Sequence, residues 1–134
     1  MKRLVSAILV LMAVSGAIAA EKTVYKQGEK NWIDTNHYFT YDFNSRPKIG
    51  YVIVKMKMFD KDGISQSGYS ILAVYSMPSM PSMGSASETP FKINKKGDYL
   101  LPVYVSMLGT WQVNIKISKD KKLISSGAIS FDVK

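Results

Sequence analysis

The chain has 134 residues and a formal net charge of +8, and 46% of its residues are hydrophobic, which fits one domain with a sizeable core. It contains no cysteine, so disulfides and thiolate metal ligands are excluded. Methionine, a single histidine and carboxylates remain as metal-binding side chains. The lysines and arginines are scattered, which predicts at most a weak and unspecific attraction to anionic lipid or acidic partners.

The first twenty residues have the pattern of a cleaved signal peptide. Lys2 and Arg3 form a positive start, residues 4–14 form an apolar run too short to stay in a bilayer, and Ala17-Ile18-Ala19 is a small-residue cleavage site. Removing residues 1–20 leaves about 114 residues and lowers the formal net charge by two, to +6. We therefore predict export to the periplasm, with no stable membrane insertion after cleavage and no nucleic acid partner.

The remainder of the chain predicts an all-β domain. Residues 21–36 are polar and are expected to form an N-terminal arm that Trp32 and Ile33 anchor, so the domain proper spans 37–134. Short runs rich in β-branched and aromatic residues then alternate with turn signals, and they predict strands at 38–43, 50–59, 69–76, 91–93, 99–105, 111–117 and 123–133. About seven short strands without a convincing helix indicate an antiparallel β-sandwich.

Period-two alternation identifies the expected core. One apolar face combines Val52 and Val54 with Met56 and Met58, so both methionines are interpreted as core residues. A second face begins at Trp111 and continues at 113, 115 and 117, which predicts a buried tryptophan.

Turns and irregular positions separate the predicted strands. The segments 60–63 and 119–122 have the composition of tight hairpin turns, and the charges of 119–122 are expected to be solvated there. Pro102 predicts an edge or a bulge in its strand, and Gly127 predicts a bulge in the last strand.

The most unusual stretch is a methionine-rich loop at residues 75–87. Met77, Met80 and Met83 recur at a spacing of three, and Pro78 and Pro81 are expected to keep helix and strand from running through. Thioethers are soft ligands that select Cu(I), so one interpretation is a copper(I) site. The other is that flexible methionines close the end of a hydrophobic core. The pattern leaves both interpretations open.

The direction of the strands predicts which residues join this loop. If consecutive strands alternate in direction, the strand that ends near residue 105 points to the same end of the sandwich as the strand that ends at Met77. Met107 should therefore lie beside the loop, as a fourth candidate ligand. His37 begins the first strand and should lie at the opposite end, which makes it a poor ligand candidate.

Residues 46–133 resemble the YtkA-like family of exported bacterial domains, which is related to FixH-like proteins. The resemblance depends on the order and spacing of five motifs: Arg46-Pro47-Lys48-Ile49-Gly50, Asp60-Lys61-Asp62-Gly63, the loop from Met77 to Met80, Gly97-Asp98-Tyr99, and Met107-Leu108-Gly109-Thr110-Trp111. The family implies an immunoglobulin-like sandwich and work beside heavy-metal efflux, copper tolerance or oxidase assembly. More loosely, the chain is similar to small secreted copper-resistance determinants. Some family members carry histidine where this chain has Ser85, so the departure disfavours Cu(II) and leaves a thioether site.

An enzyme is not expected, because the chain lacks cysteine, has one histidine and has no serine in a nucleophile-elbow setting. Two functions remain. The first is a periplasmic copper(I)-binding protein for copper tolerance or handover, with Met77, Met80, Met83 and Met107 as ligands. The second is a structural or adaptor domain of an efflux or oxidase-assembly system that uses the loop as a protein contact surface.

Overall fold

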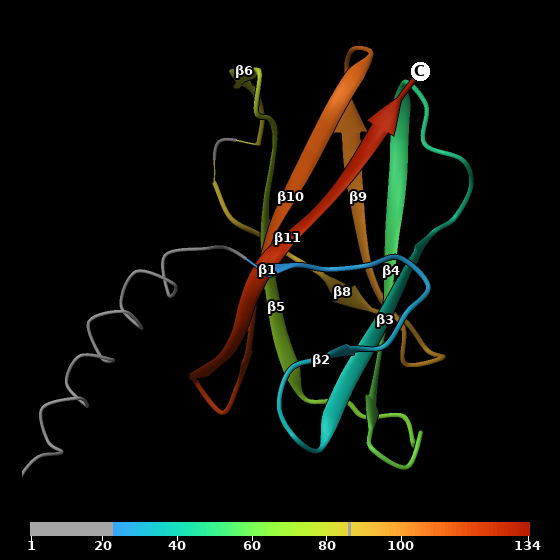
Figure 1. The fold of residues 1–134 in the computed structure, drawn as a ribbon, viewed down its shortest axis with the longest axis vertical. Helices are drawn as coiled ribbons and strands as arrows, with labels where there is room; N and C mark the ends of the chain where they lie inside the picture. Colours follow the sequence, from blue (N-terminus) through green and yellow to red (C-terminus); the bar gives the residue numbers. More distant parts are fainter. Residues whose placement is uncertain (1–22, 86) are drawn as a thin grey trace, which may run out of the picture.

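The computed structural model describes residues 23–85 and 87–134, which form two facing β-sheets (Figure 1). The expected signal peptide, residues 1–20, lies outside the described residues. The all-β sandwich predicted from the sequence is confirmed, and the described residues contain no helix with the length and apolar character needed to cross a bilayer.

The first sheet has the strand order β1-β11-β10-β5-β6, and β7 also pairs with β5. Its strands are β1 (Thr23–Val24), β5 (Tyr69–Met77), β6 (Met80–Gly84), β7 (Thr89–Pro90), β10 (Gly109–Lys119) and β11 (Lys122–Val133). All pairs in it are antiparallel except β1 with β11, which is parallel. We call this sheet A.

The second sheet, sheet B, has the order β2-β3-β4-β9-β8 and is antiparallel throughout. Its strands are β2 (Asn31–Trp32), β3 (His37–Phe43), β4 (Gly50–Asp60), β8 (Lys92–Ile93) and β9 (Tyr99–Val105). β8 pairs only with Tyr99 and Leu100, so the edge of β9 is open at Pro102, where the missing N–H costs no ladder bond.

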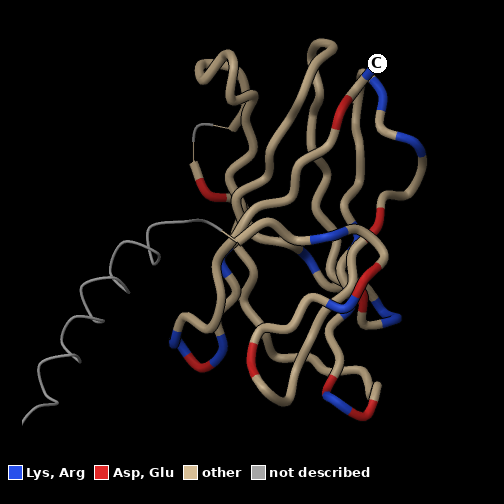
Figure 2. Tube along the Cα trace, viewed as in Figure 1, with Lys and Arg blue, Asp and Glu red and all other residues tan. Residues whose placement is uncertain are grey.

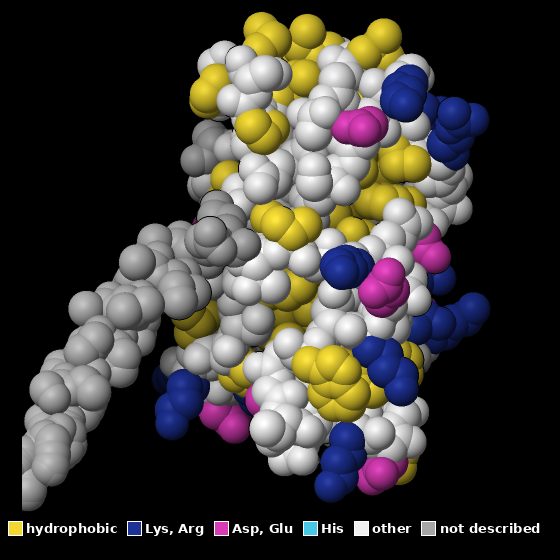
Figure 3. All heavy atoms as spheres, in the orientation of Figure 1, with side chains coloured by type: hydrophobic (Ala, Val, Ile, Leu, Met, Phe, Trp, Pro, Cys, Tyr) yellow, Lys and Arg dark blue, Asp and Glu magenta, His cyan; other side chains and the backbone are white. Residues whose placement is uncertain are grey.

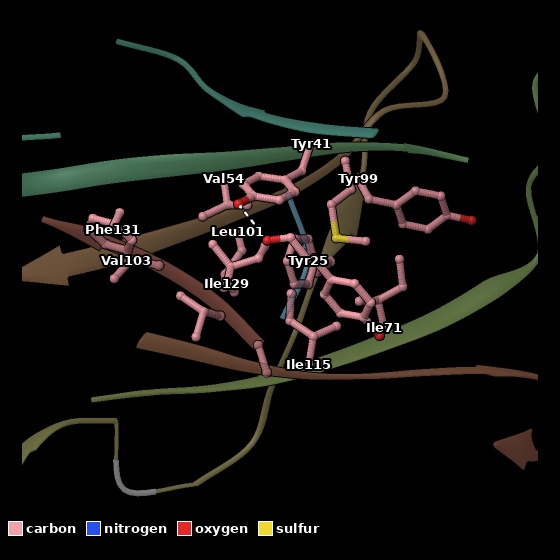
Figure 4. Close-up of a cluster of buried hydrophobic side chains, with 14 of the residues drawn as sticks. Tyr25, Tyr41, Val54, Ile71, Tyr99, Leu101, Val103, Ile115, Ile129 and Phe131 are labelled. Atoms are coloured by element: carbon pink, nitrogen blue, oxygen red, sulfur yellow. Dashed lines mark hydrogen bonds between the residues drawn. The ribbon is translucent and has the colours of Figure 1, made fainter. Parts of the chain in front are cut away.

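The core lies between the two sheets, and alternate residues along the strands of both sheets point into it (Figure 4). Met56, Met58 and Trp111 are all at most 1% exposed, so the predicted core roles of these residues are confirmed. The fully buried strand faces also include Val54, Ile115 and Ile117. A core of this kind supplies most of the favourable free energy of folding through the burial of apolar surface.

Four strands were not expected from the sequence, and each is short. β1 and β2 belong to the stretch predicted as an arm, and Tyr25, which follows β1, is buried in the core. The predicted strand at 91–93 is confirmed at Lys92 and Ile93, which form β8, and the chain crosses between the sheets at Phe91. β7 pairs with sheet A, β8 pairs with sheet B, and buried Phe91 between them donates its N–H to the carbonyl of Ile71, 2.8 Å away.

The predicted bulge at Gly127 is wrong. The register of β10 and β11 shifts between Ile117 and Ser118, while Gly127 pairs regularly with Ile115. Gly127 serves close packing instead, because a Cβ there would lie 2.7 Å from the carbonyl oxygen of Thr23 and 2.7 Å from the ring of Tyr25.

Candidate functional site

Four segments meet at one end of the sandwich, which we call the Met end. The turn between β5 and β6 lies there, because Met77 is the last residue of β5. Ser76 pairs with Gln112 near the start of β10, and residues 106–108 join β9 to β10, so this short connection shares the same end. The start of β4 joins it, because Gly50 pairs with Val105. The C-terminal end of β11 completes the group, since Gly109 pairs with Val133 (Figure 1).

The methionine-rich loop forms a β-hairpin of irregular register, in which residues 81–83 have no Cα partner on β5. Met77 and Met80 are cross-strand partners, so Pro78 and Ser79 form a two-residue turn between β5 and β6. The expectation that proline keeps strands out of this loop was wrong for residues 80–84. Pro81 lies within β6, and β6 is the edge of sheet A, where a missing N–H leaves no ladder partner unsatisfied.

The hairpin is fastened to the sheet at Ser85. The backbone N–H of Ser85 donates to the carbonyl of Tyr75 at 2.9 Å, and the Ser85 hydroxyl oxygen accepts from the N–H of Tyr75 at 3.1 Å. Gly84 makes this approach feasible, because a Cβ there would lie only 2.1 Å from the Tyr75 carbonyl oxygen. Ser85 therefore joins β6 to β5 through both its backbone and its hydroxyl.

Met77 lies in the core and also touches the neighbouring connection. It is 3% exposed, and its Cε lies 2.7 Å from the place that a Cβ on Gly109 would occupy. Gly109 has a φ of 133°, which side-chain-bearing residues rarely adopt. The absence of a side chain at Gly109 thus gives the thioether of Met77 its place, and it joins the hairpin to the β9–β10 connection.

Met107 is fixed through its backbone. The indole Nε1–H of Trp111 donates to the carbonyl oxygen of Met107 at 3.0 Å, and Trp111 itself is fully buried. The ring of Tyr75 lies 6.4 Å from the Trp111 ring between centroids, so the hairpin strand contacts the same anchor. The side chain of Met107 is partly buried against the core.

The four candidate ligands therefore share one end but not one degree of burial. Met83 and Met107 are partly buried and pack against the core that contains Met77, whereas Met80 is 42% exposed. The structure brings Met77 to the β9–β10 connection and leaves Met80 facing outward. The expectation that Met107 lies at the same end as the loop is confirmed.

His37 lies at the opposite end, as the strand directions predict. It pairs with Asp60, the last residue of β4, whereas the Met end contains the first residue of that strand. The His37 Nδ1 lies 3.0 Å from a carboxylate oxygen of Asp34. Desolvation acts to raise the pKa of Asp34, but hydrogen bonds from the Asn36 N–H and from His37, together with the charge of His37, hold this pKa below its ordinary value.

The Met end has few charges and an apolar surface. The sequence has no charged residue from 69 to 87 or from 99 to 115, and the corresponding loops carry none of the charged segments in Figure 2. Hydrophobic side chains gather over β6 and the β9–β10 connection in Figure 3. Within residues 23–85 and 87–134, no three His, Cys, Asp or Glu side chains group together to hold a metal. The methionines supply thioether sulfur at this end, which is a neutral, soft type of donor.

Two features of the site were not foreseen from the sequence. The indole–carbonyl bond at Met107 spans four residues, and the spacing of Met107 and Trp111 gives no recognised signal for it. The contact between Met77 and residue 109 is long-range. A glycine at the first position of a strand is its only trace in the sequence.

Comparison with known proteins identifies the fold and not a family. No family model matches the chain, and no curated protein matches it. A solved structure with a similar fold is that of FetP from uropathogenic E. coli strain F11, crystallised as isolated after recombinant expression in the periplasm of E. coli. The match covers 81% of this chain and 93% of FetP, at a TM-score of 0.51 and 10% sequence identity. At this identity the likeness establishes a shared fold, and membership of the YtkA-like family stays a prediction.

Proposed function

We propose that this chain is an exported, non-catalytic copper(I)-binding protein that buffers the metal or hands it over in copper tolerance. Its ligands are thioethers at the Met end, drawn from Met77, Met80, Met83 and Met107. The observation that carries the proposal is that these four residues, from the β5–β6 hairpin and the β9–β10 connection, lie at one end of the sandwich that has few charges. Cu(I) is the common metal that such soft ligands select.

The chemistry of the ligands makes the proposed binding insensitive to mild acid. Imidazole and thiolate ligands must lose a proton before they bind a metal, whereas a thioether has none to lose. Binding should therefore persist as the pH falls, and Zn(II), which favours nitrogen and thiolate ligands, should compete poorly.

The decisive experiment compares two sets of conservative substitutions. Met80→Leu/Met83→Leu/Met107→Leu removes three sulfurs at the Met end and retains Met77, which fills the core beside Gly109. Met56→Leu/Met58→Leu removes two sulfurs from the core of sheet B and serves as the control. Leucine replaces methionine at less than about 1.5 kcal/mol per site, so both variants should fold.

We expect the first variant to lose Cu(I) in a titration against a competing chelator, and the control to bind as the parent does. Unchanged Cu(I) affinity in the folded triple variant would eliminate the Met end as the site. Equal losses in both variants would attribute binding to methionine content rather than to this arrangement.

A second candidate function is an adaptor domain that contacts an efflux or oxidase-assembly protein through the same end. The exposure of Met80 at 42% and of Leu108 at 57% favours it, because a contact surface needs accessible apolar side chains. The same triple variant distinguishes the two functions. An adaptor surface tolerates leucine, which keeps the apolar bulk, whereas a copper site does not tolerate loss of sulfur.

The proposal also requires export. Support comes from the signal-peptide pattern of residues 1–20 and from the fold shared with FetP, which was expressed in the periplasm. Mass spectrometry of the protein from a periplasmic fraction should give a chain that begins at Ala20 or Glu21. An intact Met1 on the exported protein would contradict this expectation.

A further inference from the structure

The Met end has a layered surface, and its outermost layer is apolar. Three large side chains project there from three separate segments. Met80 is 42% exposed next to the β5–β6 turn, Leu108 is 57% exposed between β9 and β10, and Ile49 is 52% exposed directly before β4. Pro78 is exposed in the turn itself. None of these residues has a covering segment among the described residues.

A second layer of amphipathic and cationic side chains surrounds the tip. Tyr51 and Tyr104 are cross-strand partners one position in from Gly50 and Val105, are 69% and 49% exposed, and have ring centroids 5.2 Å apart. Arg46 and Lys48 are exposed in the connection that leads into β4. In Figure 2 the charged segments nearest this end are mostly basic.

The cations near this end outnumber the acidic side chains, because the exposed Arg46 and Lys48 stand against Asp132, whose charge a hydrogen bond does not remove. Asp132, close to the end of β11, accepts a hydrogen bond from the hydroxyl of Thr110 at 2.6 Å. Glu88 is paired with Lys116 at 2.9 Å and belongs to the segment before β7, which pairs with the middle of β5. The Met end therefore combines an exposed apolar tip with a tyrosine and lysine–arginine girdle.

This combination matches a membrane surface that carries negative charge. Tyrosine is enriched at the depth of lipid headgroups, where its ring is in an apolar environment and its hydroxyl remains in water. Lysine and arginine near an anionic surface gain electrostatic attraction, and apolar side chains that reach the acyl boundary add to it. A protein partner of arbitrary chemistry would not require these layers in this order.

We propose that the Met end docks reversibly on an anionic phospholipid bilayer. Met80, Leu108 and Ile49 enter the acyl boundary, and Tyr51, Tyr104, Arg46 and Lys48 lie at the headgroups. The contact is peripheral and spans nothing. The contact does not depend on copper. It would hold the methionine hairpin of the exported protein against the membrane surface.

The test uses residues 21–134, which contain both sheets, because the apolar run at 4–14 would bind lipid by itself. Co-sedimentation is measured with vesicles of phosphatidylcholine alone and of phosphatidylcholine with phosphatidylglycerol. The apolar variant is Ile49→Ser/Leu108→Ser and the charge variant is Arg46→Glu/Lys48→Glu. Neither variant alters a candidate copper ligand.

Matched controls come from the opposite end of the sandwich. Ile64 and Leu123 are 60% and 57% exposed, near the end of β4 and the start of β11, and they give the control Ile64→Ser/Leu123→Ser. Lys61 and Lys121 are exposed in turns at that end and give Lys61→Glu/Lys121→Glu, with the same change of net charge as the charge variant.

We expect the parent to bind the anionic vesicles and not the neutral ones. Each Met-end variant should lower the partition coefficient by roughly tenfold or more, while each control keeps most of the binding. Absence of binding by the parent would overturn the proposal and leave the apolar tip to a protein partner. Equal losses with the Lys61/Lys121 control would also overturn it, because they would indicate attraction by net charge alone. Cu(I) titration of the same variants should be unchanged, so this result is separable from the copper proposal.

Discussion

Single glycines set the geometry of the Met end. Gly84 has a φ of 126° and lets β6 close onto the carbonyl of Tyr75, while Gly109 leaves room for the thioether of Met77. The two contacts differ in kind. The Met77 methyl group is the end of a flexible side chain and can move, whereas the Tyr75 carbonyl belongs to the backbone of a paired strand. Gly84 should therefore be the less replaceable of the two.

We predict that Gly84→Ala lowers the free energy of unfolding more than Gly50→Ala does. Gly50 has a φ of 113° with nothing within 4 Å of the added Cβ, so its substitution introduces backbone strain alone, about 1–3 kcal/mol. Gly84→Ala should add about 1–3 kcal/mol from overpacking against the Tyr75 carbonyl. Urea denaturation of both variants measures the difference, and equal losses would mean that β6 readjusts without cost.

Tyr41 links stability to alkaline pH. Burial, followed by the charge of Asp42, raises the pKa of Tyr41 from 10.0 to about 12. In the unfolded chain the phenol ionises near pH 10, while the folded chain retains its proton, so the folded state binds more protons and stability falls as the pH rises. The contribution is complete below pH 10 and is lost through about pH 12.

Tyr41→Phe should accordingly flatten the fall in stability between pH 10 and pH 12. Denaturant melts across this interval, with phenolate absorbance recorded in parallel, provide the measurement. Some slope should remain, because burial also raises the pKa values of Tyr25 and Tyr69. A profile identical to that of the parent would show that Tyr41 does not retain its proton in the folded state.

Among the elements, the long strands follow from the sequence and the short ones do not. Apolar alternation persists over enough residues in β4 and β10 to define their buried faces. β1, β2 and β7 have two residues each, too few for any periodicity, and their pairing depends on the neighbours that the fold supplies. β6 was missed for a different reason, because proline rules apply to strands with two neighbours and β6 has one.

The turn between β10 and β11 offers a substitution that should raise the free energy of unfolding. Lys119 pairs with Lys122, so Asp120 and Lys121 form a two-residue turn, and their φ values are 52° and 66°. Two positive φ angles suit Asn-Gly, which is the preferred pair in such hairpins. Asp120→Asn/Lys121→Gly leaves the net charge unchanged and should raise the free energy of unfolding by about 1 kcal/mol. Thermal melts measure the shift in midpoint. An unchanged midpoint would mean that the positive φ angles of Asp120 and Lys121 cost the parent no stability.

On the scale of the molecule, the two ends of the sandwich differ in chemistry. The Met end combines thioethers with an apolar surface, and the opposite end combines charged turns with the His37–Asp34 pair. Strand direction alone was sufficient to predict which residues share an end, because consecutive strands of an antiparallel sandwich run in opposite directions. It could not predict that Met77 is buried and Met80 exposed, since burial depends on contacts between residues distant in sequence, such as Met77 with Gly109.

The stretch after residue 22 closes the sandwich at its centre, and Tyr25 makes the connection. Its backbone N–H donates to the carbonyl of Ala128 in β11 at 2.8 Å, and its hydroxyl bonds the Ser125 hydroxyl at 2.8 Å, both in sheet A. Its ring meets that of Phe39 in sheet B edge to face, with centroids 4.7 Å apart. Tyr25 is 4% exposed, and the tyrosine ring takes the space that the missing side chain of Gly127 leaves.

Tyr25→Ala should therefore cost about 3–5 kcal/mol of folding free energy, as for a central core aromatic. The neighbouring Val24 is 60% exposed, so Val24→Ala should change the free energy of unfolding by less than about 0.5 kcal/mol. Because Tyr25 contacts both sheets, its loss should lower the denaturation midpoint of the whole domain in a single transition and should not produce a separate early phase. Urea melts followed by both fluorescence and far-ultraviolet circular dichroism provide the measurement. A Tyr25→Ala variant as stable as Val24→Ala would mean that residues 23–25 rest on the sandwich without holding it together.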